Sequence, residues 1–171
     1  MDLSTKATVT TQTGVPVELP AVELTPDEAM LLGRYATWMS AWQLIAKLYC
    51  RDCGPAHEVE VFIDRDKIGI ICQHRMLWYQ GPVPVVLTTH PEAPALLVPV
   101  FFPTEVTLDL MSAGLLHDYD AFCRKHGLRE ALWCMACEEQ GEASGVRPSI
   151  TATTIELMCR CTRRTHRGLV Q

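Results

Sequence analysis

Residues 48–78 read LYCRDCGPAHEVEVFIDRDKIGIICQHRMLW, and this stretch decides which fold the sequence predicts. Apolar residues alternate with acidic ones over 59–63, polar residues follow at 65–67, and a second apolar run covers 68–71. Alternation with a period of two is typical of a half-buried strand, so the stretch predicts a β-hairpin with its turn at 65–67. Two close pairs of metal-ligating residue types enclose this hairpin: Cys50 with Cys53, and Cys72 with His74.

The C-terminal half repeats this layout. A Cys-x2-Cys pair is followed by residues 150–155, whose β-branched side chains favour a strand, and then by a Cys-x-Cys pair. The four cysteines are Cys134, Cys137, Cys159 and Cys161. Eighteen residues separate the two pairs in the first half and 21 in the second, and the first cysteines of the halves lie 84 residues apart. The shared layout indicates a duplicated unit.

Close cysteine pairs favour a metal site over a disulfide framework, because one ion needs several ligands within a few ångströms. The first ten residues contain no secretory signal, so we expect a cytoplasmic protein whose thiols stay reduced. Zinc is the expected metal, since structural zinc takes four cysteine or histidine ligands in a tetrahedron. The opposing interpretation is that the eight cysteines are inert core residues.

The pattern resembles the zinc-ribbon family, in which a Cys-x2-Cys knuckle, a β-hairpin and a second ligand pair enclose one zinc ion. Gly54 follows the first knuckle, as is common in that family. Both second pairs have one intervening residue where the family usually has two, so a treble-clef-like arrangement is the alternative. The resemblance implies two structural zinc ions per chain, held by Cys50, Cys53, Cys72 and His74, and by Cys134, Cys137, Cys159 and Cys161.

Three other residues compete for the second site. Cys123 and His126 are three apart on a predicted helix and could join the Cys-x2-Cys pair of that half, and His166 could replace one thiolate. We prefer the four-cysteine set because it repeats the logic of the first half. Four protein ligands leave no open position for water or substrate, so such sites contribute folding energy and not catalysis.

Two helices are predicted outside the hairpins. Thr25, Pro26 and Glu28 form a helix start with a capping box, and the second helix is expected over 110–125, followed by Gly127 at its C-terminus. An apolar stripe with helical spacing extends the first helix to about residue 48 and should pack on the core. The stripe consists of Leu31, Tyr35, Trp38, Trp42, Ile45 and Tyr49.

The predicted fold class is α+β, with two small helix-plus-zinc-ribbon units joined by a proline-rich extended segment. Prolines interrupt the apolar stretch over 83–102, so no membrane span is predicted. The expected segments are an extended arm over 1–24, a first unit over 25–80, a connector over 81–107, a second unit over 108–162 and a basic tail over 163–171.

The formal net charge of −5 is unevenly distributed. Residues 159–171 contain no acid, and the other 158 residues carry 11 basic and 20 acidic groups, a net charge of −9. An acidic body argues against wrapping a long nucleic acid, whose phosphates it would repel. A local contact with nucleic acid or another anion is expected only through Arg160, Arg163, Arg164 and Arg167.

One catalytic pattern has to be weighed. His90-Pro91-Glu92 followed by Cys134-x2-Cys137 is similar to zinc-dependent nucleoside deaminases, although Trp133 stands where that family has proline. Phosphate-binding glycine loops, Gly-x-Ser-x-Gly and His-Glu-x2-His do not occur in the sequence. We therefore expect a protein that is not an enzyme.

Two functions remain. The first is a zinc-stabilised structural or adaptor protein that contacts other proteins of a larger assembly, for example a minor virion component in a phage head, neck or tail. The second is a zinc-ribbon nucleic-acid-binding or transcription-regulatory protein that uses its C-terminal arginines. The first is favoured, because the acidic body opposes the second.

Overall fold

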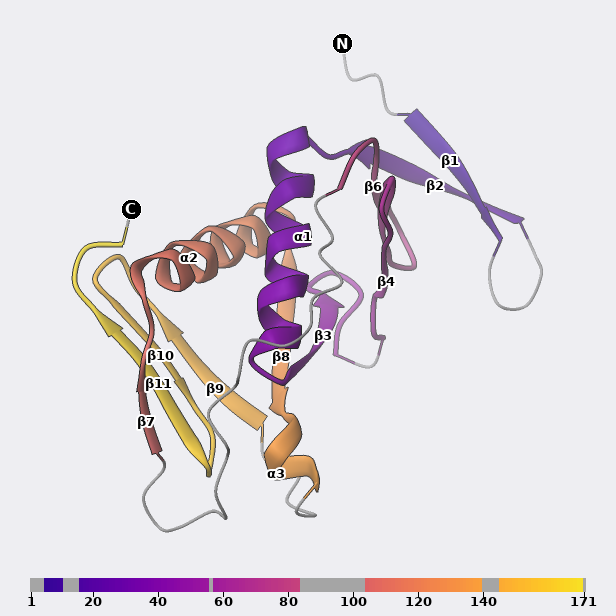
Figure 1. Cartoon of the computed structure of the whole chain (residues 1–171). Coiled ribbons are helices and arrows are strands. Elements are labelled where there is room, and N and C mark those ends of the chain that lie inside the picture. Colours follow the sequence, from indigo (N-terminus) through magenta and orange to yellow (C-terminus); the bar gives the residue numbers. More distant parts are fainter. Residues whose placement is uncertain (1–4, 11–15, 56, 84–103, 140–144, 171) are drawn as a thin grey trace.

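The computed structural model of the chain describes residues 5–10, 16–55, 57–83, 104–139 and 145–170 (Figure 1). Over these residues the fold is α+β, as predicted, with three helices and two sheets. The helices are α1 (Pro26–Ala41), α2 (Leu110–Lys125) and α3 (Met135–Glu139). None of the helices in these ranges has the length and apolar character needed to cross a bilayer.

The five-stranded sheet has the order β1-β2-β6-β5-β4, and the six-stranded sheet has the order β3-β8-β9-β10-β11-β7. The first contains β1 (Thr5–Thr10), β2 (Pro16–Glu23), β4 (Glu60–Ile63), β5 (Lys67–Ile71) and β6 (Met76–Gln80). The second contains β3 (Leu44–Cys50), β7 (Thr104–Thr107), β8 (Leu128–Cys134), β9 (Gly145–Ile150), β10 (Thr154–Met158) and β11 (Thr162–Arg167). Helices α1 and α2 pack on each other and on β3 and β8, and this is the centre of the core (Figure 1).

Both long helices begin with a side-chain cap, and the cap of α1 is the predicted one. The Thr25 hydroxyl accepts a hydrogen bond from the Glu28 N–H at 3.2 Å, and the Glu28 carboxylate accepts one from the Thr25 N–H at 3.1 Å, so the predicted capping box is confirmed. Asp109 caps α2 by accepting from the Ser112 N–H at 2.7 Å. Helix α2 also has its predicted bounds, and Gly127 follows it with the left-handed φ of 62°.

The first helix is shorter than the sequence predicts. It ends at Ala41 instead of near Leu48, and Gln43, with φ 55°, turns the chain into β3. The predicted stripe is therefore divided, because Ile45 and Tyr49 lie on the strand. Strand formation is favoured here because all seven residues of β3 pair with β8, which satisfies their backbone hydrogen bonds.

The predicted hairpin is present as β4 and β5, which pair antiparallel. The prediction of one strand over 150–155 is wrong: Ile150 ends β9 and Thr154 begins β10. The Thr151 hydroxyl accepts a hydrogen bond from the Thr154 N–H at 2.9 Å and closes a turn between them. Threonine favours strands, but its hydroxyl can also stabilise a turn in this way.

Strands near both ends of the described part of the chain pair within sheets. Within the expected basic tail, residues 163–167 belong to β11, which pairs antiparallel with β10 and parallel with β7. The expected N-terminal arm is a hairpin of β1 and β2, and β2 runs parallel to β6. Of the predicted connector, residues 84–103 lie outside the described residues.

The two halves of the chain share the order of their strands and long helices, β2-α1-β3-β4-β5-β6 and β7-α2-β8-β9-β10-β11, and the second half adds the short helix α3 between β8 and β9. In each half the first strand runs parallel to the last. Where the halves meet, Lys47 pairs with Ala131, which lies 84 residues later and therefore occupies the equivalent position of the second half. Equivalent residues face each other in this way when a two-fold axis relates the two strands. Tyr35 and Tyr119, also 84 residues apart, stack with ring centroids at 3.5 Å and an 8° interplanar angle. The duplicated layout thus extends through the fold.

Each half also supplies an arginine to the other. Arg75 donates to the carbonyl of His126 at the C-terminus of α2, and Arg164 lies 3.5 Å from the carbonyl of Trp42 at the C-terminus of α1. A cation is favourable at a helix C-terminus, where the carbonyls carry partial negative charge. These reciprocal contacts join the halves in addition to the β3–β8 pairing.

Candidate metal centres

The first cluster consists of Cys50, Cys53, Cys72 and His74, whose ligand atoms all lie within 4.8 Å of one another. The Nδ1 atom of His74 lies 3.0 Å from the Cys53 sulfur and 3.2 Å from the Cys72 sulfur. Its distance to the Cys50 sulfur is 3.8 Å. The fold thus brings together the two residue pairs that the sequence places around the β4–β5 hairpin.

The second cluster consists of Cys134, Cys137, Cys159 and Cys161, again with all ligand atoms within 4.8 Å of one another. The sulfur of Cys161 lies 3.5 Å from each of the other three sulfurs. All four side chains are buried, and none of them forms a disulfide.

The shortened second pair of each cluster lies on a tight turn. The Cys72 N–H donates to the carbonyl of Arg75 at 3.0 Å, and the Cys159 N–H donates to the carbonyl of Thr162 at 3.0 Å. Both are four-residue turns between neighbouring strands. One residue between the two ligands of the pair is therefore sufficient, because the turn brings both ligand side chains within 4.8 Å of the other ligands of the cluster.

The ligand sets fit zinc in number, type and spacing. A tetrahedral zinc ion at about 2.3 Å from each sulfur places neighbouring sulfurs roughly 3.8 Å apart. The sulfur–sulfur distances of 3.5 Å in the second cluster are close to this value. Thiolate and imidazole are also ligands that zinc prefers, so each cluster could hold one such ion after small side-chain shifts.

The electrostatics of the second cluster favour a bound cation. A hydrogen bond from Cys159 lowers the pKa of Cys134 to about 4 against the effect of burial, with further help from the N–H groups of Cys137 and Ala136. Burial, together with the neighbouring sulfurs, raises the pKa of Cys161 to about 11. Several thiolates in one buried space repel each other, and a divalent cation offsets that repulsion.

The first cluster is more open than the second. Cys53 and Cys72 are half-buried and His74 is exposed. The carboxylate of Asp52 lies 3.5 Å from Nε2 of His74, whose Nδ1 faces the sulfurs. A carboxylate in this position orients a metal-ligating histidine. Sequence reasoning missed Asp52; its place between the two cysteines of the knuckle is the only available signal.

The three alternative ligands lie elsewhere. His126 Nε2 is 3.2 Å from the carboxylate of Glu28, and His166 Nδ1 is 3.2 Å from a backbone carbonyl of the β7–α2 connection. Cys123 is buried in α2, where burial and the charge of Glu130 raise its pKa to about 12. The geometry therefore favours the four-cysteine set.

The deaminase-like pattern receives no geometric support from its cysteines. His90 and Glu92 lie outside the described residues. Cys134 and Cys137 share their cluster with two further cysteines, and this completes a set of four ligands. A catalytic zinc site instead keeps a coordination position open.

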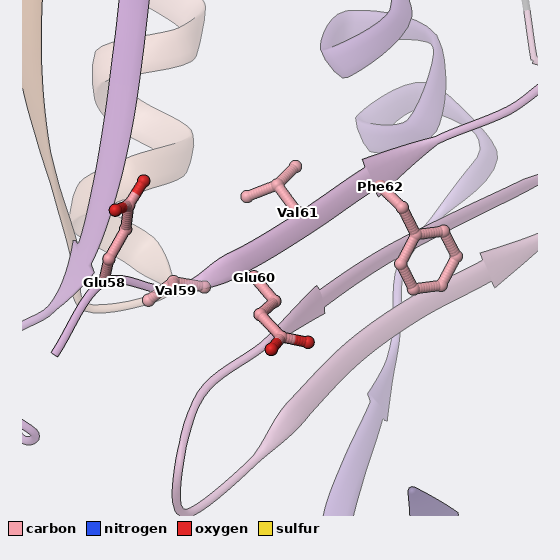
Figure 2. Close-up of a pocket in the computed structure, with 5 residues that line it drawn as sticks. All are labelled: Glu58, Val59, Glu60, Val61 and Phe62. Carbon is pink, nitrogen blue, oxygen red and sulfur yellow. The ribbon is translucent and has the colours of Figure 1, made fainter. Parts of the chain in front are cut away.

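An open groove of about 540 Å³ runs along β4, in the segment between the two ligand pairs of the first cluster (Figure 2). It is lined by Glu58, Val59, Glu60, Val61 and Phe62. Val61 projects from the opposite side of the strand to Glu60 and Phe62 (Figure 2). The two carboxylates of the groove are those of Glu58 and Glu60, and the Glu58 carboxylate lies 4.0 Å from Lys47.

The four C-terminal arginines have different environments. Arg164 is only 1% exposed and lies 5.8 Å from the centre of the Trp42 ring, so its predicted contact with an external anion is excluded. Arg163 forms ion pairs with Glu156 at 3.0 Å and Glu105 at 3.8 Å. Arg160 and Arg167 are exposed. The predicted anion contact can therefore not involve all four side chains.

We compared the chain with models of protein families, with curated proteins and with solved structures, and nothing matched. The functional assignment therefore rests on the chemistry and geometry of the two clusters and of the surface.

Proposed function

We propose that the chain is a non-enzymatic, zinc-stabilised structural or adaptor protein of a larger assembly, built from two zinc-ribbon-like units. The observation that carries this proposal is the presence of two four-ligand clusters at equivalent places in the two halves. Each set is complete for a tetrahedral ion and leaves no coordination position for water or substrate. Sites of this kind stabilise a fold and do not activate a reactant.

Zinc would have a definite structural role in this topology. In each half one ligand pair begins at the end of a central strand, β3 or β8, and the other lies on the turn before the last strand. A bound ion would tie the central strand to that turn. The first half needs this link most, because three of the four residues of β4 are exposed and β3 is joined to this region by the isolated Tyr49–Glu58 bridge.

Exposed apolar side chains support a role in protein contacts. Leu110 and Met111, adjacent at the start of α2, are 57% and 87% exposed, and Leu169 is 72% exposed. Neighbouring apolar side chains left in water are typical of surfaces that bind other proteins. A minor virion component of a phage is one setting that provides such partners.

Native mass spectrometry of the intact protein, before and after treatment with a chelator, tests the metal part of the proposal. We expect two zinc ions per chain, and loss of the folded circular dichroism spectrum when both are removed. One zinc ion would mean that one cluster has another role. A fully folded, metal-free protein would contradict the proposal.

The assembly part needs a separate measurement in the native source. We expect the chain to sediment with a large particle when a lysate is fractionated by size and probed with an antibody. Zinc-loaded protein that migrates only as a free monomer would rule out the assembly role and leave the metal assignment intact.

A further inference from the structure

One face of the six-stranded sheet gathers cationic side chains that lie far apart in the sequence. Strand pairing places Tyr49 opposite Arg129, Trp133 opposite Gly145, and Arg147 opposite Met158. Residues opposite each other on paired strands point to the same side of a sheet, and so do alternate residues of one strand. These side chains therefore share one face of the sheet, here called the outer face. The cations of the outer face are Lys47, Arg129, Arg147, Arg163 and Arg167. Helices α1 and α2 pack on the opposite face of β3 and β8 (Figure 1).

The acidic groups near this face leave it with excess positive charge. Glu105 and Glu156 both pair with Arg163, and Glu58 lies 4.0 Å from Lys47. These are three carboxylates beside five cations, in a chain whose net charge is −5. Arg129, Arg147 and Arg167 are exposed, and no ion pair joins them to the described part of the chain. The outer face is thus a positive surface on an acidic protein.

Two aromatic rings lie among these cations. Tyr49 and Trp133 are half-buried, and each sits directly across the β3–β8 pair from another outer-face residue. The Nζ atom of Lys47 lies 5.5 Å from the centre of the Trp133 ring. A partly exposed ring beside a cation can stack a base while the cation meets the adjoining phosphate.

We propose that the outer face binds single-stranded nucleic acid. Exposed arginines on neighbouring strands would neutralise phosphates, and Tyr49 and Trp133 would stack unpaired bases. A duplex keeps its bases stacked on one another, so these rings would have no base to meet. This surface goes beyond the proposed adaptor role. The outer face also differs from the arginine-rich contact predicted from the sequence, because Arg164 is buried. Of the three outer-face arginines without an ion pair to the described residues, two come from β8 and β9.

Fluorescence anisotropy with labelled 15-nucleotide oligo-dT and oligo-rU tests the proposal on the zinc-loaded full chain. We expect binding at 50 mM salt that weakens linearly on a log–log plot as salt rises to 200 mM. Arg129→Gln with Arg147→Gln should lower the slope of that plot by about 1.4, because each phosphate contact to a single strand contributes about 0.7. Comparing the affinities for the two oligonucleotides shows whether the outer face prefers single-stranded DNA or RNA.

A second variant separates stacking from charge. Trp133→Leu should weaken binding by about 5- to 100-fold, with little change in the salt slope. The matched control is Arg34→Gln with Lys67→Gln, which removes two exposed cations from α1 and β5 and should leave the affinity unchanged. Zinc content and circular dichroism are measured for every variant, so a failure of folding is not mistaken for a loss of binding.

Three results would overturn the inference. The first is no binding by the zinc-loaded protein at 50 mM salt. The second is an equal loss of affinity in the control variant, which would mean a diffuse charge effect. The third is equally tight binding of polyglutamate that is insensitive to Trp133→Leu, because the face would then suit an acidic protein partner. Binding is measured on folded protein of known zinc content, so a failure of this inference is distinguishable from a failure of the zinc assignment.

Discussion

Glu130 places a carboxylate against the two stacked tyrosines where the halves meet. The hydroxyl of Tyr35 donates to one carboxylate oxygen, and the other oxygen is buried without a hydrogen-bond partner among the described residues. Burial raises the pKa of Glu130 to about 7, against the lowering effect of the neighbouring hydroxyls of Tyr35 and Tyr119. The equivalent position in the first half is Ala46, so this charge is a departure from the duplicated pattern.

This carboxylate should make stability depend on pH. The native state holds the proton of Glu130 up to about pH 7, whereas in the unfolded chain it is lost near the ordinary value of 4.5. Stability is therefore highest below pH 4.5 as far as this group is concerned, and it falls by about 3 kcal/mol as the pH rises through 4.5 to 7. Glu130→Gln can still accept from Tyr35 and removes this loss, so the variant should be more stable than the parent at pH 8.

Urea unfolding of the zinc-loaded protein at pH 5.5 and pH 8 measures this difference. Glu60→Gln, on the exposed strand β4, is the matched control and should retain the pH dependence of the parent. Equal pH dependence in Glu130→Gln and the parent would show that the carboxylate is not the cause.

Each helix-to-strand connection turns on one residue with a left-handed backbone. Gln43 has φ 55° between α1 and β3, and Gly127 has φ 62° at the equivalent place between α2 and β8. Glycine adopts this conformation readily, whereas a residue with a Cβ atom is disfavoured by about 1–2 kcal/mol. The same turn is thus strained in the first half and relaxed in the second.

Substitutions at these two positions should have opposite effects. Gln43→Gly should raise the free energy of unfolding by about 0.5–1 kcal/mol, and Gly127→Ala should lower it by about 1 kcal/mol. The added Cβ at residue 127 would also come within 3.3 Å of Arg75 Nη2, which contacts the adjoining carbonyl. Urea unfolding of both variants against the parent provides the measurement. A shift of the same sign in both would contradict the argument.

The two metal clusters differ in exposure across the molecule. All four ligands of the second cluster are buried, whereas in the first cluster only Cys50 is buried and His74 is exposed. A chelator or competing ligand must reach an ion before it can remove it. Because all four of its cysteines belong to the buried core, whereas only Cys50 of the first cluster does, loss of the ion from the second cluster should also disturb more of the fold.

Chelator treatment of the proposed two-zinc protein should therefore proceed in two steps. The first zinc ion should leave several-fold faster than the second, and most of the circular dichroism signal should be lost only with the second. Native mass spectrometry over time, with Cys53→Ser and Cys137→Ser as matched variants, assigns each step to a cluster. Simultaneous loss of both ions at one rate would contradict this difference between the clusters.

Local signals predicted a substantial part of this architecture. The capping box at Thr25, the bounds of α2, the β4–β5 hairpin and the members of both clusters follow from residues close together in the sequence. The end of α1 was not predictable in this way. Ile45 and Tyr49 continue a helical spacing, and only the distant strand β8 makes the extended conformation favourable.

The sequence by itself determined the eight candidate ligands, the α+β class and the repeated layout, because spacing, capping and alternation act within a few residues. Only the tertiary structure decided the β3–β8 register, the burial of Arg164 and the environment of Glu130. It also decided which cations share the outer face with Trp133. These features depend on pairing between residues about 80 or more positions apart, or on which face of a paired strand a side chain occupies. A change of one residue in strand register would reverse every such assignment.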